Sequence, residues 1–405
     1  MILAGTLILP ESDRSVRLAE GWLRIRGDRI AEVGEGPAPA AVDLGGPGAI
    51  ICPGFIDAHM HLPQFDSIGV DGLTLLDWLE RAIFPAEARW EDRDYAGDMT
   101  RRVVDQLLAH GTTGIAAYAT VHHEATRAAI DALHESGLAA IVGQVLMDRN
   151  APPELIRPPD QLIAEAQSLQ GRGRVQVAVT PRFAVSCTDE LLHRAGSLAK
   201  RTGAPIQTHL SETVPECRLI ARLFDDTPYT EVYRRADLLG PRTILGHAIW
   251  LDADERRTLA QTRSIVAHCP TANLFLQAGS MDLAAHMDAG VRISLGSDVA
   301  GGPDRSMVRV ARAMIETAKR LEHTPPCASE CWWWITGGNA GALGWRDVGR
   351  LEPGAWADVL IIEPDVRWRD AADPLSTLLY AWDDRWLRRT IVAGRIAFPG
   401  ARARA

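Results

Sequence analysis

The sequence lacks the features that would place the protein in an oxidising compartment or in a membrane. Its 405 residues include six cysteines, and none of them forms a Cys-x-x-Cys pair, so buried free thiols are expected rather than a disulfide framework. No basic segment precedes the apolar N-terminal residues, which argues against a signal peptide. No apolar run reaches the length of a membrane span. These absences predict a cytoplasmic protein.

The sequence is also poor in positive charge. Lys and Arg number 43 against 52 Asp and Glu, which gives a formal net charge of −9. Binding to nucleic acid phosphates requires a basic face, so nucleic acid is not expected as a partner. Hydrophobic residues make up 46% and charged residues 23% of the chain, which is typical of a globular protein. The length allows one large barrel domain with a smaller second domain.

Both ends of the chain are predicted to form strands. Residues 22–26 and 29–33 alternate between polar and apolar around a turn, and residues 357–362 and 389–398 are strand-like as well. Strands at both ends have to meet in space to bury their apolar faces. We therefore expect one small composite β-sandwich domain built from both termini.

The middle of the chain alternates short apolar runs with helical stretches. Counted from the apolar run at Ile50, the pattern gives eight βα units, which is typical of a (β/α)₈ TIM barrel. An open doubly wound sheet is the alternative, but no glycine-rich phosphate-binding motif supports it. The predicted α/β fold has three segments: residues 1–52 (first part of the β-sandwich), 53–348 (the barrel) and 349–405 (second part of the β-sandwich).

Polar side chains follow several of these predicted barrel strands. His59 and His61 end the first strand, His209 the fifth and His247 the sixth, and Asp298 follows the eighth. Residues two apart on a strand face the same side, and all strand carboxyl ends of a parallel barrel open on one face. A buried, hydrogen-bonded core role would be ordinary for one such histidine. Five residues at equivalent positions favour a site for a divalent metal.

Glu212 follows His209 by three residues and is the candidate for proton transfer. Water bound to zinc or ferrous iron has a pKa near neutrality, and a nearby carboxylate that is not a ligand can accept its proton. The alternative for Glu212 is a solvated residue that opens the following helix.

Five motifs together resemble the amidohydrolase superfamily, in its branch of purine, pyrimidine and triazine deaminases and chlorohydrolases. They are residues 53–61 (PGFIDAHMH), 208–212 (THLSE), 246–247 (GH), 268–273 (HCPTAN) and 296–298 (GSD). The resemblance covers nearly the whole chain. It implies one divalent metal per chain, zinc in preference to ferrous iron, with His59, His61, His209 and Asp298 as ligands. It also implies catalytic roles for Glu212 as proton shuttle, for His247 and for Asp298.

Other segments resemble the guanine-deaminating members of that branch. They are residues 61–65 (HLPQF), 76–79 (LDWL), 84–87 (FPAE), 180–187 (TPRFAVSC) and 298–302 (DVAGG). The resemblance implies hydrolysis of guanine to xanthine and ammonia by metal-activated water attacking C2, and a homodimer. The substrate would be surrounded by His61, Gln64, Arg182, Phe183, His209, Glu212 and Asp298.

The recognition residues also suit a purine on physical grounds, although other interpretations exist. Arg182 offers a planar set of donors, Gln64 can donate and accept, and Phe183 can pack against a ring. Arg182 could instead be a salt-bridged surface residue and Phe183 plain barrel core. A pterin or 8-oxoguanine shares the same ring edge and is the alternative substrate. A triazine hydrolase and a non-catalytic barrel without metal are further alternatives.

Two further features are given structural interpretations. His268 is expected to be a structural residue or to support the site from outside the ligand set. The run Trp332-Trp333-Trp334 is expected to serve packing or a subunit interface, since large aromatic side chains dominate both.

Overall fold

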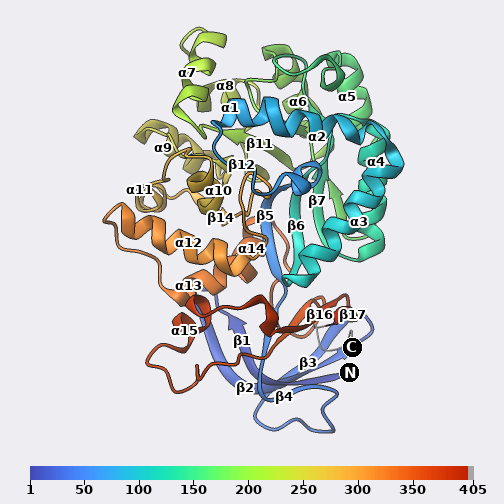
Figure 1. Cartoon of the computed structure of the whole chain (residues 1–405), viewed down its shortest axis with the longest axis vertical. Coiled ribbons are helices and arrows are strands. Elements are labelled where there is room, and N and C mark those ends of the chain that lie inside the picture. The colour runs from blue at the N-terminus through green and yellow to red at the C-terminus, as the bar shows by residue number, and fades with distance from the viewer. Residues whose placement is uncertain (400–405) are drawn as a thin grey trace.

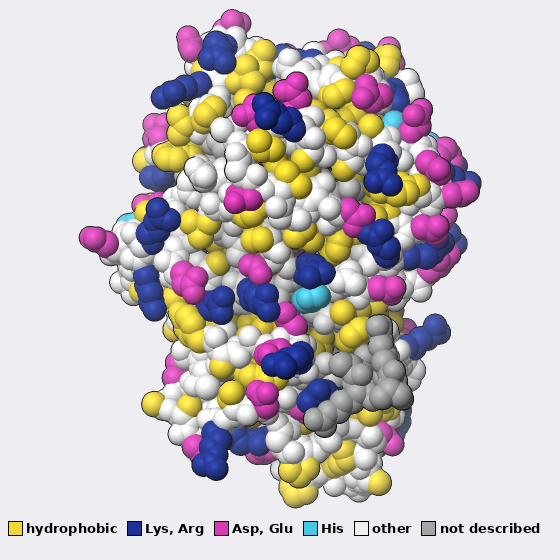
Figure 2. Space-filling model, in the orientation of Figure 1, with side chains coloured by type: hydrophobic (Ala, Val, Ile, Leu, Met, Phe, Trp, Pro, Cys, Tyr) yellow, Lys and Arg dark blue, Asp and Glu magenta, His cyan; other side chains and the backbone are white. Residues whose placement is uncertain are grey.

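The computed structural model describes residues 1–399 and divides them between a barrel and a smaller β-sheet (Figure 1). Strands from both chain ends lie together in this sheet, below the barrel in the view of Figure 1. No helix within residues 1–399 is both long enough and apolar enough to cross a membrane. Lys and Arg side chains alternate with Asp and Glu over the face shown in Figure 2.

The smaller sheet contains seven strands in the order β17-β16-β15-β4-β1-β2-β3. The strands are β1 (Ile2–Pro10), β2 (Val16–Arg26), β3 (Arg29–Glu35), β4 (Leu44–Pro53), β15 (Val359–Ile362), β16 (Leu387–Val392) and β17 (Arg395–Pro399). β1 and β4 run parallel, and the other neighbours are antiparallel. The pairing of β4 with β15 joins the two ends of the chain, as the sequence predicts.

Two details of this sheet correct the sequence-based expectation. The single strand expected over residues 389–398 is a hairpin of β16 and β17, because Gly394 adopts a positive φ of 77° that turns the chain. The apolar run that was counted as the start of the first barrel strand belongs to β4. The run contains no polar residue because both faces of β4 are buried there. Ile51 packs in the core of the small sheet, whereas Ile50 and Cys52 pack in the main core with the barrel.

The barrel strands are parallel and occupy eight positions. They are β5 (Phe55–His61), β6 (Thr112–Tyr118), β7 with β8 (Ala139–Gly143, Val145–Leu146), β9 with β10 (Val175–Val177, Thr180–Pro181), β11 (Ile206–Leu210), β12 (Thr243–His247), β13 (Ile265–His268) and β14 (Arg292–Leu295). A bridge between Val179 and Ile206 connects the fourth position to the fifth. The predicted TIM-barrel architecture is confirmed.

Helices follow the strands around the outside of the barrel (Figure 1). They are α3 (Arg93–Ala109), α4 (His123–Ser136), α5 (Pro159–Ser168), α6 (Asp189–Thr202), α7 (Val214–Leu223), α8 (Tyr229–Arg235), α9 (Ala253–Thr262), α10 (Pro270–Phe275), α11 (Leu283–Asp288) and α12 (Met307–Arg320). Local chemistry sets their ends. In α6, for example, the Thr188 side chain accepts from the backbone N–H of Leu191 at the start, and Gly203 ends the helix at a φ of 67°.

Further short helices lie outside this repeating pattern. They are α1 (Leu75–Trp78) and α2 (Phe84–Ala88), which are linked by a π-helical turn, and α13 (Ala328–Trp333), α14 (Asn339–Ala342) and α15 (Pro374–Tyr380).

Side chains join the first and last barrel strands. Asn339 of α14 donates to the carbonyl oxygens of Ile56 and Leu295, at 2.7 and 2.8 Å, and accepts from the Leu295 N–H at 2.8 Å. The Asp57 carboxylate accepts from the backbone N–H and the hydroxyl of Ser297, at 2.9 and 2.5 Å. These bonds hold the start of β5 beside the carboxyl end of β14. The predicted site residues His59, His61 and Asp298 follow a few positions further along the chain.

Candidate active site

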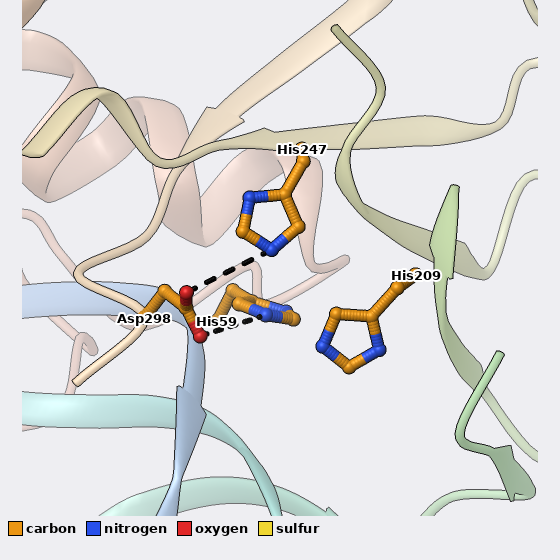
Figure 3. A group of neighbouring side chains, drawn as sticks. All are labelled: His59, His209, His247 and Asp298. Atoms are coloured by element: carbon orange, nitrogen blue, oxygen red, sulfur yellow. Dashed lines mark ion pairs between the residues drawn. The ribbon is translucent and has the colours of Figure 1, made fainter. Parts of the chain in front are cut away.

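Four buried side chains converge at the carboxyl ends of the barrel strands (Figure 3). One ligand atom from each of His59, His209, His247 and Asp298 lies within 4.8 Å of the others. They come from β5, β11, β12 and the loop after β14. Residues separated by more than two hundred positions in the sequence therefore form one cluster, as expected for a parallel barrel.

His61 lies beside this group of four. Its Nε2 is 3.0 Å from Nε2 of His209 and 3.5 Å from Oδ1 of Asp298. His59 and His247 approach the same carboxylate, with Nε2 at 3.4 Å from Oδ1 and 3.7 Å from Oδ2. The structure thus brings together five of the six residues predicted as metal ligands or catalytic groups, and the sixth, Glu212, lies beside His247. Which imidazoles are ligands and which is catalytic stays a prediction.

Close backbone approach and local strain place these side chains. A Cβ at Gly246 would lie 2.7 Å from the His59 ring, and a Cβ at Gly296 would lie 2.6 Å from the His59 Cβ. Only glycine fits at both positions. His247 and Asp298 adopt positive φ values of 67° and 48°, which cost conformational energy for non-glycine residues and are typical of functional sites.

Hydrogen bonds from outside the cluster fix two of the imidazoles. Nδ1 of His209 lies 2.7 Å from the carbonyl oxygen of Arg182, and Nδ1 of His247 lies 2.8 Å from Oδ1 of Asn273. A neutral imidazole that donates its Nδ1–H to an oxygen keeps its lone pair on Nε2. Both Nε2 atoms face the cluster, so both rings offer a lone pair there.

The donor set fits a divalent metal. Neither ring nitrogen of His59 has a hydrogen-bond partner, and Nδ1 of His61 has none either, although buried polar atoms normally have one. Burial is the largest cause that lowers the pKa of His59, His61 and His209 well below the ordinary value, so these rings are held neutral. Neutral imidazoles with one carboxylate suit zinc or another divalent transition metal.

Two buried carboxylates complete the site. Burial raises the pKa of Asp298 to about 6, against the opposing effect of His247 and Arg182. Burial also raises the pKa of Glu212 well above its usual range, and the neighbouring Glu216 and Asp298 add to the rise. Oε2 of Glu212 lies 3.6 Å from Nε2 of His247. A carboxyl group that is easily protonated near a metal site is suited to proton transfer.

The backbone at Glu212 is held by Glu216, the residue that closes the capping box of α7. Oε2 of Glu216 accepts from the N–H groups of Glu212 and Thr213, at 2.9 and 3.1 Å, and Oε1 accepts from the Tyr229 hydroxyl at 2.9 Å. Glu212 itself is 4% exposed and precedes the N-cap of the helix. The alternative of a solvated residue that opens the helix is therefore wrong.

One cavity adjoins the cluster. It is lined by every residue predicted to surround the substrate, together with His247 and the apolar residues Leu75, Trp78, Leu79 and Leu276. Arg182 is buried and pairs with the buried carboxylate of Glu87 at 2.5 Å, so it is not a surface residue. Phe183 is also buried and contributes to the cavity wall.

Several residues near the cavity had no role in the sequence analysis. Glu87, Trp78 and Asn273 stand within motifs that were recognised, but the motifs do not say what these side chains contact. Tyr118 ends β6, and its ring stacks on His61 with centroids 4.5 Å apart. Only its position at a strand end, shared with the site histidines, could have pointed to it.

The remaining sequence features lie outside the cavity. His268 is buried at the end of β13 and is not part of the cluster. Trp332 and Trp334 are buried, and the Trp332 indole donates to the carbonyl oxygen of Leu375 at 3.2 Å. These two tryptophans therefore serve packing within the chain.

The chain belongs to the amidohydrolase family, whose sequence profile matches residues 50–397. A guanine deaminase from Dictyostelium discoideum is 32% identical over 377 residues, which cover 88% of this chain and 83% of the relative. The solved structure of Escherichia coli guanine deaminase superposes with a TM-score of 0.92 at 30% identity, over 98% of this chain and 99% of the other. Guanine deaminase from C. acetobutylicum, solved with guanine bound in the active site, also gives a TM-score of 0.92, at 28% identity over 98% and 99% of the two chains.

Proposed function

We propose that this protein is a metal-dependent hydrolytic deaminase that converts guanine and water to xanthine and ammonia. The observation that carries the proposal is the single cavity in which the histidine–carboxylate cluster meets Arg182, Gln64 and Phe183. The similarity to guanine deaminases over most of the chain supports the substrate.

The cluster is suited to hold one divalent metal through His59, His61, His209 and Asp298, with zinc as the proposed ion. When bound, the metal supplies Lewis-acid activation of a water molecule at neutral pH. His247 lies against both Asp298 and Glu212 and would orient the attacking water through Nε2. The Nδ1 contact with Asn273 keeps that Nε2 free to accept a hydrogen bond.

Glu212 is the proposed proton shuttle. Its raised pKa, caused chiefly by burial, lets the carboxylate take a proton from the attacking water and return it to N3 of the ring. A bond forms between the water oxygen and C2 as this proton moves. The second proton of the water, still on that oxygen, then passes to the exocyclic nitrogen, the bond from C2 to this nitrogen breaks, and ammonia leaves while the oxygen remains on C2 as a carbonyl. Oε1 of Glu212 has no hydrogen-bond partner in the protein, so it is available for this exchange.

Recognition of the ring would use other residues that line the same cavity. Arg182 supplies N–H donors for a carbonyl oxygen or N7, and Gln64 faces a base edge. The Phe183 ring and the apolar residues of α1 supply flat and apolar walls. Burial of the whole set excludes water from the reacting atoms.

The proposal is tested by measuring ammonia release from protein of known metal content, with guanine, 8-oxoguanine, pterin and a triazine side by side. We expect turnover of guanine to exceed the others and to rise in proportion to bound metal, up to about one ion per chain. Turnover of pterin with guanine inert would keep the metal site and reject the substrate. Bound metal without turnover of any compound would reject the deaminase function.

Three expectations from the sequence accompany this proposal. We propose a division into residues 1–52 and 349–405 for the β-domain and 53–348 for the barrel, which limited proteolysis tests. We also propose a cytoplasmic homodimer, which cell fractionation and sedimentation equilibrium test.

A further inference from the structure

Glu87 is a fully buried carboxylate beside the cavity to which neither the sequence nor the proposed mechanism gives a role. It lies on α2, and its side chain is 0% exposed. Its Oε1 accepts from Nε2 of Gln64 at 3.0 Å and from an Nη1–H of Arg182 at 2.5 Å. Its Oε2 has no partner. Both hydrogen bonds of Glu87 are thus made to residues that line the cavity.

The contact with Glu87 fixes which end of the Gln64 amide faces a ligand. An ionised carboxylate only accepts hydrogen bonds, so Gln64 has to present its NH₂ group to Glu87. Because the amide is planar, its carbonyl oxygen then points away from Glu87. Gln64 is 1% exposed and lines the cavity, so this oxygen is the acceptor that it offers there.

The same carboxylate fixes Arg182. Its guanidinium contacts Glu87 through one terminal nitrogen, and its Cζ lies 5.8 Å from the centre of the Phe84 ring. A guanidinium carries five N–H donors, so donors remain for a ligand after the bond to Glu87. The ion pair also neutralises a cation that would otherwise be buried without compensation.

We infer that Glu87 is a positioning residue that makes the cavity select a 6-oxo purine over a 6-amino purine. One acceptor on Gln64 beside donors on Arg182 complements a lactam edge, whose N1–H donates and whose C6 carbonyl accepts. A 6-amino purine reverses both polarities, so its N1 lone pair would meet the Gln64 carbonyl and its amino group would meet Arg182. The inference rests on the proposed function, because it concerns the same cavity.

The experiment compares guanine with 2,6-diaminopurine, which carries the same 2-amino group but a 6-amino group in place of the oxygen. Glu87→Gln gives residue 87 its own NH₂ group, so Gln64 is free to reverse its amide. We expect kcat/KM for guanine to fall about 100-fold, mainly through KM, and the ratio of guanine to 2,6-diaminopurine to fall at least about tenfold. Metal content should be unchanged.

Glu165→Gln is the matched control. Glu165 also accepts from a glutamine, since Nε2 of Gln144 lies 2.7 Å from its Oε2, but it is not among the residues that line the cavity. Its ratio of the two substrates should equal that of the wild type. An unchanged ratio in Glu87→Gln, whether or not both activities fall, would overturn the inference.

A second variant and a binding measurement complete the test. If Glu87→Gln does not fold, Gln64→Leu removes the acceptor instead, and its substrate ratio should fall similarly; an unchanged ratio would overturn the inference. If the wild type turns over neither purine, the proposed function fails. In that case, equilibrium binding of hypoxanthine and adenine to the wild type and to Glu87→Gln tests the role of Glu87 independently of turnover. An equal preference for hypoxanthine over adenine in both proteins would count against this role.

Discussion

Buried carboxylates occur both at the junction of the barrel with the small sheet and in the active-site cavity, but their surroundings differ. At the junction, Asp358 accepts from both terminal nitrogens of Arg174 and from the Ala393 N–H. In the cavity, Oε1 of Glu212 has no partner and burial raises the pKa of Glu212 well above its usual range. A fully paired carboxylate stabilises the fold, whereas an unpaired one is available for a ligand or a proton.

The difference between paired and unpaired buried carboxylates predicts the largest effect, a loss of activity, for Glu212→Gln. The amide keeps the size of the side chain but cannot shuttle a proton, so kcat should fall roughly 1,000-fold, within the range for a lost general acid/base. The free energy of unfolding should stay equal or rise, because an amide avoids burial of a charge. Metal content should not change. Steady-state kinetics, urea denaturation and metal analysis measure these three quantities. A wild-type rate would remove Glu212 from the mechanism.

Metal removal is expected to have the next largest effect. The imidazoles of His59 and His61 carry ring nitrogens without a hydrogen bond in the protein, and a bound metal stabilises the folded state by mass action. Chelation should therefore lower the free energy of unfolding by about 3–4 kcal/mol relative to a metal-saturated sample. Adding zinc should restore it in the wild type but not in His59→Ala. An equal response to zinc in both proteins would contradict the proposed ligand set.

Asp358→Asn should destabilise the protein without altering catalysis. It leaves the largely buried Arg174 without a counter-charge, which should lower the free energy of unfolding by about 3 kcal/mol. The rate per folded molecule should not change, since Asp358 is not among the residues that line the cavity. Asp131→Asn, which breaks an exposed ion pair with Arg172, is the control and should cost about 0.5 kcal/mol or less. Equal losses of unfolding free energy in the two variants would contradict the expected difference between the buried and the exposed ion pair.

The smallest predicted effect concerns acid stability. Burial lowers the pKa of His268 to about 3, so between roughly pH 6.5 and pH 3 only the unfolded chain binds a proton at this residue. The stability that neutral His268 gives the folded state is fully present above the pKa of a histidine in the unfolded chain. This stability declines as the pH falls below that pKa, by up to about 1.4 kcal/mol per pH unit. Urea denaturation of chelator-treated protein measures this effect. Between roughly pH 6.5 and pH 5, the free energy of unfolding should fall less steeply in His268→Gln than in the wild type. The exposed His193→Gln should keep the wild-type slope.

Much of the fold was predictable because it depends on local periodicity. The alternation of residues 22–26 and 29–33 specifies the β2–β3 hairpin, and Thr188 and Gly203 mark the ends of α6. The hairpin with its turn at residues 393–394 was missed because the residues on both sides of this turn are equally strand-like. The run at Ile50 was wrongly counted as the start of the first barrel strand, although the predicted division after residue 52 left it in the small domain. The count failed because a strand buried on both faces has the same composition in either sheet.

The sequence by itself determined which residues can carry the chemistry. Histidines and carboxylates placed after apolar runs have to gather at one end of a parallel barrel, since the strand direction aligns their carboxyl ends. Only the tertiary structure decided how each group is tuned. Glu87 meets Gln64 and Arg182 across 23 and 95 residues, and Asn273 meets His247 across 26. Such contacts depend on how helices and loops pack around the cavity, and no local pattern of residues encodes that packing.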